Sequence, residues 1–194
     1  MEKYLYLTEV EWEQSWIMGG TVPLFSASKY RSESRSGIFT PDENVIDTSS
    51  HDYSSLSPHI HIEPNCYGRV TVVNSMLGNR LMKKAEIDRR FQDGVVLCLA
   101  NICNVELATK LGKKVCLRVK DVKYLKEILD SQIGSKGIMR NCTYRKDHIR
   151  DLFTKSVDDA WQHEFRIFWA NAPSQVVTLP KDIAEREFIV SEVF

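Results

Sequence analysis

The sequence predicts an α+β fold in a single domain that spans residues 1–194. Short segments with alternating or unbroken apolar residues recur along the chain and indicate many strands. Helical patterns lie between them at irregular intervals, which is typical of a mixed α+β domain rather than of a doubly wound sheet. There is no internal repeat or domain linker, and a hydrophobic content of 43% suffices for one core.

The first quarter of the chain predicts a strand, a helix, a strand and a long loop. Residues 3–8 have strand character, and residues 9–18 form a short helical pattern with acidic residues in its first turn and two glycines after it. Residues 22–26 predict the second strand. Residues 28–52 lack periodicity and are rich in Ser, Asp, Arg and Gly, and their aromatic and arginine residues favour a binding loop over a flexible linker.

The next segments alternate between strands and one helix. Residues 59–64 and 68–74 show alternation and β-branched enrichment, so both predict strands. Residues 80–92 predict a helix. The unbroken apolar run at residues 95–100 has strand length and indicates a strand that is buried on both faces.

The second half of the chain begins with a short helical pattern at residues 105–111, followed by a strand at 114–120. Asp121 is a typical N-cap, and apolar residues at positions 122, 125, 128 and 129 indicate an amphipathic helix after it. We expect the remaining elements to be strands near 137–145, 162–169, 174–178 and 187–193, and a helix near 147–160.

Composition excludes several classes of protein. No apolar run approaches the roughly 18 residues that span a bilayer, and the N-terminus lacks a basic segment followed by an apolar one, so we expect a cytoplasmic protein. The 5 cysteines are odd in number and form no C-x-x-C pair, which argues against a disulfide framework and a zinc site. His59 and His61 could face one side of a strand, but without a third ligand they predict no metal site.

The net charge is zero, but the charges are unevenly distributed. Between Asn79 and Ser156 there are 18 Lys and Arg against 9 Asp and Glu, and the rest of the chain holds 8 against 17. Two explanations remain open: a surface for nucleic acid or another polyanion, or a fold whose basic and acidic parts neutralise each other. The basic residues of the possible nucleic-acid surface include Lys113, Lys114, Lys120, Lys123, Arg140, Arg145 and Lys146.

Residues 161–169, W-Q-H-E-F-R-I-F-W, carry the clearest candidate site. Because successive side chains of a strand point to opposite faces, an aromatic face would enter the core and Gln162, Glu164 and Arg166 would share the other face. A buried carboxylate needs a partner, and Arg166 is the nearest candidate. A structural Glu–Arg pair and a functional carboxylate both explain this pattern. Phosphate-loop, Rossmann, serine-hydrolase and zincin motifs are absent from the sequence.

Several segments resemble a known fold. Y-L-Y-L-T at residues 4–8, L-F-S-A-S at 24–28 with Tyr30 and Arg31 beyond it, and Q-x-E at 162–164 resemble, in that order, the three motifs of the ADP-ribosyltransferase fold. K-S-V-D-D-A-W-Q-H-E-F-R-I resembles the closing motif of bacterial proteins thought to share that fold, and residues 96–121 resemble their middle segment. The closest association is with ADP-ribosyltransferase toxins of toxin-antitoxin-chaperone antiphage systems, which modify RNA.

This resemblance implies ADP-ribosyltransferase-like mixed sheets with peripheral helices, NAD as co-substrate, and roles for named residues. Glu164 would stabilise the cation that develops on the ribose as nicotinamide leaves, Gln162 would orient the acceptor, and Tyr30 would stack on nicotinamide. Tyr6 stands where related enzymes carry His or Arg, and a phenol supplies no positive charge at neutral pH. The implied NAD-binding residues are Tyr6, Thr8, Ser26, Ser28, Arg31 and Arg166.

The leading hypothesis is therefore an NAD-dependent mono-ADP-ribosyltransferase toxin of antiphage defence. It would act on RNA and would require an antitoxin protein as partner. Three alternatives stay open: the same transfer to a protein acceptor, NAD hydrolysis on the same fold, and a nucleic-acid-binding module without catalysis.

Overall fold

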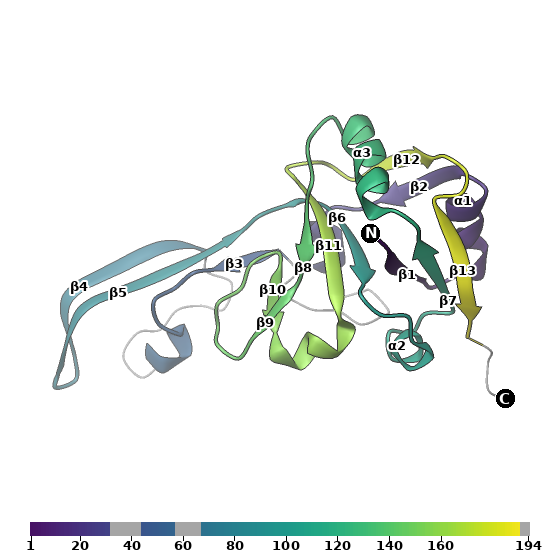
Figure 1. Cartoon of the computed structure of the whole chain (residues 1–194). Helices are drawn as coiled ribbons and strands as arrows, with labels where there is room; N and C mark the ends of the chain where they lie inside the picture. The colour runs from purple at the N-terminus through teal and green to yellow at the C-terminus, as the bar shows by residue number, and fades with distance from the viewer. Residues whose placement is uncertain (32–43, 57–66, 191–194) are drawn as a thin grey trace.

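The computed structural model describes residues 1–31, 44–56 and 67–190, without the side chains of Arg31, Tyr53 and Ser54 (Figure 1). The expected strand at 59–64, with His59 and His61, and residues 32–43 of the expected loop at 28–52 lie outside the described residues. The described chain is a mixed α+β fold, as the sequence predicts.

The central element is a six-stranded antiparallel sheet in the order β13-β7-β1-β6-β11-β8. Three smaller sheets are formed by β2 with β12, by β9 with β10, and by β3, β5 and β4. The strands are β1 (Lys3–Leu7), β2 (Gly20–Leu24), β3 (Val45–Asp47), β4 (Gly68–Leu77), β5 (Arg80–Phe91), β6 (Gly94–Ala100), β7 (Val115–Val119), β8 (Ile138–Asn141), β9 (Thr143–Arg145), β10 (Thr154–Ser156), β11 (Glu164–Ala170), β12 (Gln175–Leu179) and β13 (Ala184–Ile189).

Three α-helices lie at the periphery of the described chain: α1 (Glu13–Ile17), α2 (Val105–Lys110) and α3 (Val122–Ile133). The Asp121 side chain caps α3 by accepting from the Lys123 N–H at 3.0 Å, and Gly134 ends the helix with a φ of 77°. The amphipathic helix predicted after Asp121 is therefore confirmed. The expected helix at 9–18 is shorter, because residues 10–12 form a 3-10 turn before α1 begins.

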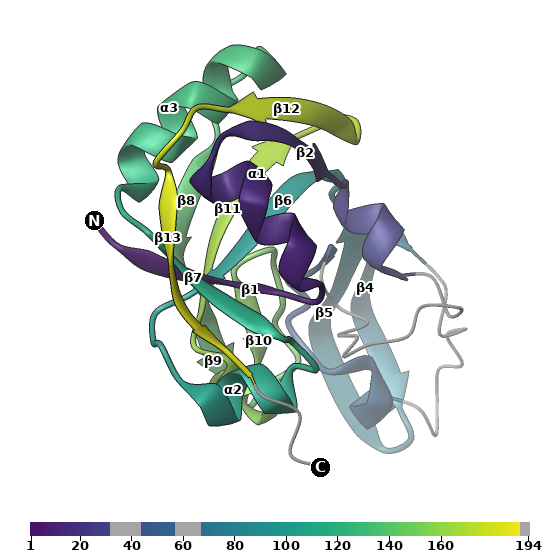
Figure 2. The same cartoon turned by 90° about the vertical axis from the view of Figure 1, so that its right-hand side faces the viewer.

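Both faces of the central sheet are covered. On one face, alternate residues of the strands pack against α3, α1 and the β2–β12 pair, which Figure 2 shows lying across the sheet. On the other face, Val96 and Phe168 form a smaller core with Leu152 and Phe153. The burial of β6 on both faces confirms the prediction from its unbroken apolar run.

The helix predicted at residues 80–92 is wrong, because this segment is the strand β5. Lys, Ala, Glu, Leu and Met favour helices, but β5 pairs with β4 from Arg89 to Arg80 in one continuous register. The turn at Gly78-Asn79, where Gly78 has a φ of 58°, closes a hairpin that extends from the body (Figure 1). Tertiary pairing therefore overrides helical propensity here.

The helix predicted at residues 147–160 is also wrong. Residues 154–156 form β10, which pairs in parallel with β9, and Val157–Gln162 form a 3-10 helix. This turn ends at His163, whose φ of 48° is left-handed, so β11 begins at Glu164 rather than at 162. Gln162 accordingly lies in the turn and not on the strand.

The predicted alternation holds from Glu164 onward. Phe165, Ile167 and Trp169 enter the larger core, and Phe168 enters the smaller one. None of the described helices is long and apolar enough to cross a membrane.

Candidate functional site

A cavity of about 800 Å³ opens where the central sheet divides. β1 pairs with β7 along five residues but with β6 only at Tyr4↔Ala100. At the opposite end of β6, Val95 forms an isolated β-bridge with Ser26. Residues 96–99 of β6, which lie between these two pairings, line the cavity. The volume falls in the range of about 300–1,000 Å³ that is usual for small-molecule sites.

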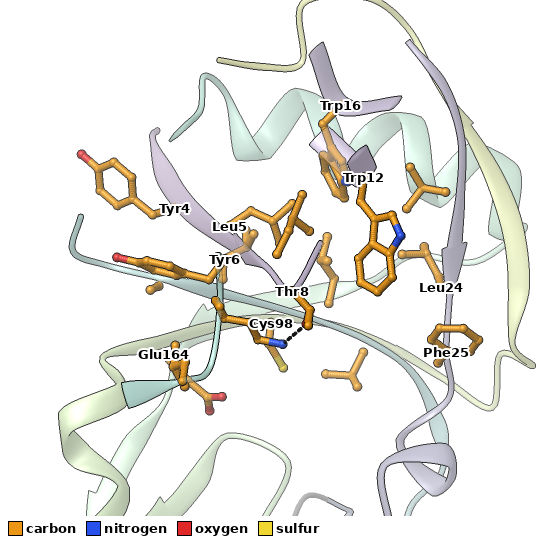
Figure 3. Close-up of a pocket in the computed structure, with 18 of the residues that line it drawn as sticks. Tyr4, Leu5, Tyr6, Thr8, Trp12, Trp16, Leu24, Phe25, Cys98 and Glu164 are labelled. Carbon is orange, nitrogen blue, oxygen red and sulfur yellow. Dashed lines mark hydrogen bonds between the residues drawn. The ribbon is translucent and has the colours of Figure 1, made fainter. Parts of the chain in front are cut away.

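Aromatic and cationic side chains surround this cavity. Figure 3 shows Trp12 and Phe25 at the end of the cavity opposite Glu164, with Tyr6 and Thr8 on the β1 side. Lys110 and Lys113, from α2 and the turn after it, also line the cavity. The rings offer flat surfaces for stacking, and the ammonium groups offer charge to an anionic ligand.

Glu164 lies in the cavity wall with its carboxylate held by two cations. Oε2 lies 2.8 Å from Nη2 of Arg166 and 3.3 Å from Nζ of Lys155, and it accepts from Nε of Arg166 at 3.1 Å. Cys142 Sγ lies 3.6 Å from the same oxygen. Within the described part of the chain, all of these contacts use Oε2. Glu164 also lines the cavity, and none of these contacts within the described residues uses Oε1.

The two cations control the charge of Glu164. Burial alone raises the pKa of this carboxyl, but the charges of Arg166 and Lys155 and their hydrogen bonds outweigh burial and hold the pKa below its ordinary value. The Arg166 and Lys155 side chains are themselves 1% and 2% exposed. A buried carboxylate that stays ionised beside a cavity is an arrangement found in active sites and in structural ion pairs alike.

Lys155 also connects Glu164 to Gln162. Its Nζ donates to Oε1 of Gln162 at 2.6 Å and lies 4.0 Å from Oδ2 of Asp159. Nε2 of Gln162 donates to Oδ1 of Asp159 at 3.2 Å. Gln162 and Glu164 therefore meet at one ammonium group and both line the cavity, although they do not share a strand face as the sequence alternation predicts.

The start of β11 is fixed by a tyrosine. The backbone N–H of Glu164 donates to the Tyr144 hydroxyl at 2.9 Å. Burial raises the pKa of Tyr144 to about 12, so this phenol remains protonated at neutral pH. The contact ties β9 to the residue that carries the carboxylate.

Tyr6 lines the cavity, but the backbone engages its hydroxyl. The phenol donates to the carbonyl of Ile102 at 2.7 Å and accepts from the N–H of Asn104 at 2.9 Å. Burial raises the pKa of Tyr6 well above its ordinary value. Tyr6 thus holds the segment before α2, whereas the neighbouring Thr8 accepts from Nζ of Lys113 at 2.9 Å (dashed line in Figure 3).

Of the other expected site residues, some line the cavity and some lie outside its lining. Tyr30 lines the cavity and packs on the smaller core. Ser26 and Ser28 lie outside the lining, where their hydroxyls are 2.9 Å apart and the Ser26 N–H donates to Ser174 Oγ at 2.8 Å. Arg166 lies behind Glu164, donating to the Leu152 carbonyl at 2.8 Å. The side chain of Arg31 lies outside the described residues.

Sequence reasoning missed the role of Lys155. It lies nine residues before Glu164 in the chain. The helix predicted at residues 147–160 would not place it there, whereas the observed strand β10 and the 3-10 turn after it bring Lys155 to the carboxylate. The available signal was the lysine that opens the K-S-V-D-D motif. Trp12, Phe25 and Lys110 carried no comparable signal, because only the packing of α1, β2 and α2 brings them to one cavity.

Much of the expected basic surface is neutralised within the fold. Lys114 pairs with Glu9 at 2.9 Å, and Lys120 lies 3.8 Å from Glu185. Arg145 similarly pairs with its neighbour Asp147 at 2.5 Å. The pairs of Lys114 and Lys120 support the explanation in which the basic middle and the acidic ends of the chain neutralise each other, whereas Arg145 is neutralised within the basic middle itself.

The described cysteines Cys98, Cys103, Cys116 and Cys142 form no disulfide with one another. Among the described residues, no group of three or more His, Cys, Asp or Glu side chains could hold a metal ion. A scan against family models found no match to this chain, and searches of curated proteins and of solved structures found none either.

Proposed function

We propose that the cavity binds NAD and that the protein is an ADP-ribosyltransferase with an ADP-ribosyltransferase-like fold. One observation carries the proposal: Glu164, whose side chain is 13% exposed, is kept ionised by Arg166 and Lys155 in the wall of an 800 Å³ cavity lined by aromatic and cationic side chains. The acceptor RNA, the cytoplasmic location and the role as a toxin with an antitoxin partner are further parts of this proposal, and they rest on the sequence resemblance.

The lining matches the chemistry of NAD. Two flat heterocycles need stacking surfaces, which Tyr30, Phe25 and Trp12 supply. The pyrophosphate needs cations or N–H donors, which Lys110 and Lys113 supply. Tyr6, whose hydroxyl the backbone already occupies, contributes a ring face rather than the hydrogen bond that the resemblance implies.

The proposed reaction breaks the bond between the nicotinamide nitrogen and the anomeric carbon of the ribose. Nicotinamide leaves with the bonding electrons as a neutral molecule, and positive charge develops on the ribose. Oε1 of Glu164 stabilises that charge, because the carboxylate is already ionised and needs no reorganisation. The acceptor hydroxyl then bonds to the anomeric carbon and releases its proton to solvent.

Gln162 acts in this scheme as a positioning residue. Its amide oxygen and nitrogen are already bonded to Lys155 and Asp159, so it holds Lys155 against Glu164. The resemblance instead implies that Gln162 orients the acceptor.

The test uses NAD labelled in its phosphates, incubated separately with cellular RNA and with cellular protein. We expect label on RNA with the wild type, at least a hundredfold less with Glu164→Gln, and no change with Glu185→Gln, a matched control on β13. Label on protein instead would reassign the acceptor. Release of nicotinamide without labelled macromolecule would identify hydrolysis. No label and no nicotinamide from the folded wild type would leave Glu164 as a structural residue.

A further inference from the structure

The hairpin of β4 and β5 is largely exposed, and no residue of β4 is buried. Its strands of 10 and 12 residues extend together beyond the body of the molecule (Figure 1). At about 3.4 Å per residue, β5 spans about 40 Å. A two-stranded ribbon without a packed face is rarely stable or useful by itself, which suggests that this one serves contact with another molecule.

The charges of the hairpin divide it into two halves. In the basal half, the carboxylates are occupied: Asp88 binds Arg69 at 2.6 Å and Thr48 at 3.1 Å, and Asp47 of β3 binds Arg89 at 3.0 Å. The distal half, residues 72–84, contains Arg80, Lys83 and Lys84 and no Asp or Glu. Lys84 reaches back to Glu86 at 3.4 Å, so the positive charge of the tip that no ion pair among the described residues compensates is that of Arg80 and Lys83.

The distal cations lie on both faces of the ribbon. By strand alternation, Arg80 and Lys84 share one face, while Lys83 lies on the other with Leu81. None of the ion pairs within the described residues involves Arg80 or Lys83. A ribbon that is positive on both faces suits a target that can place negative charge on both of its sides. A flat acidic patch on a protein reaches only one side.

The exposed apolar side chains of the tip are aliphatic. Val73, Met76 and Leu81 are 58%, 63% and 57% exposed, and the segment 68–90 contains no aromatic residue. Such a surface cannot stack on bases in the way that single-strand binding sites do. Its recognition would therefore be mainly of phosphates, and independent of base sequence.

We infer that the β4–β5 hairpin is a nucleic-acid-binding arm that contacts phosphates through Arg80, Lys83 and Lys84. The binding does not depend on the proposed transferase. The arm leads directly into the cavity wall, because β5 ends at Phe91 and β6 begins at Gly94. If the proposed function holds, the arm would retain the acceptor strand near the cavity.

The binding test measures fluorescence anisotropy of a labelled 30-nucleotide single-stranded RNA and a 30-base-pair DNA duplex, each titrated at several salt concentrations. Arg80→Ala/Lys83→Ala is compared with Lys136→Ala/Lys181→Ala, which removes the same charge from exposed sites elsewhere. We expect the arm variant to weaken binding of the preferred form roughly tenfold and to lower its salt slope by about 1.4 for a single strand or about 1.8 for a duplex. The control should bind within twofold of the wild type.

Three results would overturn the inference: equal binding by the wild type and the arm variant, equal losses in both double variants, or competition by polyglutamate as effective as that by RNA. Tighter binding of the single-stranded RNA would identify RNA as the source of the phosphates, and tighter binding of the duplex would identify DNA. Both double variants should keep the wild-type melting temperature, because the altered side chains are exposed.

Failure of the transferase is distinguishable from failure of the arm. Glu164→Gln should bind nucleic acid as the wild type does, even if no transfer is ever detected. If transfer to RNA occurs, the arm variant should reduce labelling of a 30-nucleotide acceptor but not of a 4-nucleotide acceptor, which is too short to reach from the cavity to the tip. Equal reduction with both acceptors would contradict the role of the arm in retaining substrate.

Discussion

Two clusters of charge in this protein contain similar groups in different surroundings. Beside the cavity, Glu164 lies between Lys155 and Arg166, with both cations almost fully buried. On β7 of the central sheet, next to the edge strand β13, Arg118 binds the carboxylates of Glu2, Glu185 and Glu187, and its side chain is 31% exposed.

Surroundings decide what each cluster can do. Water screens the charges around Arg118, so these pairs add little to stability and leave no charge unsatisfied when one member is lost. The cluster beside the cavity has little water to replace a lost partner, so removal of one member leaves its neighbours with fewer contacts. The contribution of an ion pair to stability therefore depends more on where the pair lies than on how many pairs there are.

The largest expected effect separates the two clusters directly. Lys155→Met removes one of the two cations of Glu164, which keeps Arg166, and leaves the buried Gln162 oxygen without its donor, so the free energy of unfolding should fall by about 1–3 kcal/mol. Arg118→Met should produce no resolvable change. Urea denaturation at neutral pH measures both. A Lys155→Met variant as stable as Arg118→Met would show that the buried cluster is open to solvent.

The pH dependence of stability sharpens the comparison. Glu164 has a pKa below its ordinary value of 4.5 in the folded protein, so its ionised form stabilises the fold above about pH 4.5. This contribution is lost as the pH falls from 4.5 through the folded pKa. The wild type should therefore exceed Glu164→Gln in stability at pH 7, and the difference should shrink at pH 3.5.

Urea titrations of both proteins at the two pH values test this expectation. The exposed Glu185→Gln variant serves as the control and should track the wild type at both. A difference between the wild type and Glu164→Gln that stays constant with pH would indicate that Glu164 is not ionised in the folded protein.

A smaller effect concerns the two tyrosines of β1. Tyr6→Phe leaves the Ile102 carbonyl and the Asn104 N–H without the phenol, so we expect a loss of about 1–2 kcal/mol in unfolding free energy. Tyr4→Phe should cost less, because no hydrogen bond of the Tyr4 hydroxyl occurs within the described residues. If NAD binds, calorimetry should find less than a threefold change in its affinity for Tyr6→Phe. A large loss of affinity without a loss of stability would return Tyr6 to a direct binding role.

Local patterns predicted some elements well. Asp121 and the apolar positions after it predicted α3, because capping and amphipathic periodicity depend on residues close together in the chain. The apolar run of β6 indicated burial on both faces, since no solvent-facing side chain interrupts it. The same reasoning failed for β5, because pairing with β4 outweighs the helical propensity of its residues.

The candidate site was partly predictable for similar reasons. Glu164 and Arg166 are two residues apart on one strand, so alternation was enough to bring them together. Lys155 reaches the same carboxylate through a parallel strand pair and a left-handed residue at His163. No periodic pattern encodes that path.

The sequence by itself determined the α+β class, the α3 helix, the buried β6 strand and the pairing of Glu164 with Arg166. These depend on periodicity, capping and short-range alternation, which act over a few residues. Only the tertiary structure decided where β1 and β6 separate, that Trp12, Tyr30 and Lys113 meet at one cavity, and that β4 and β5 form an extended arm. Those outcomes depend on contacts between segments that are distant in the chain, whose energies no local pattern records.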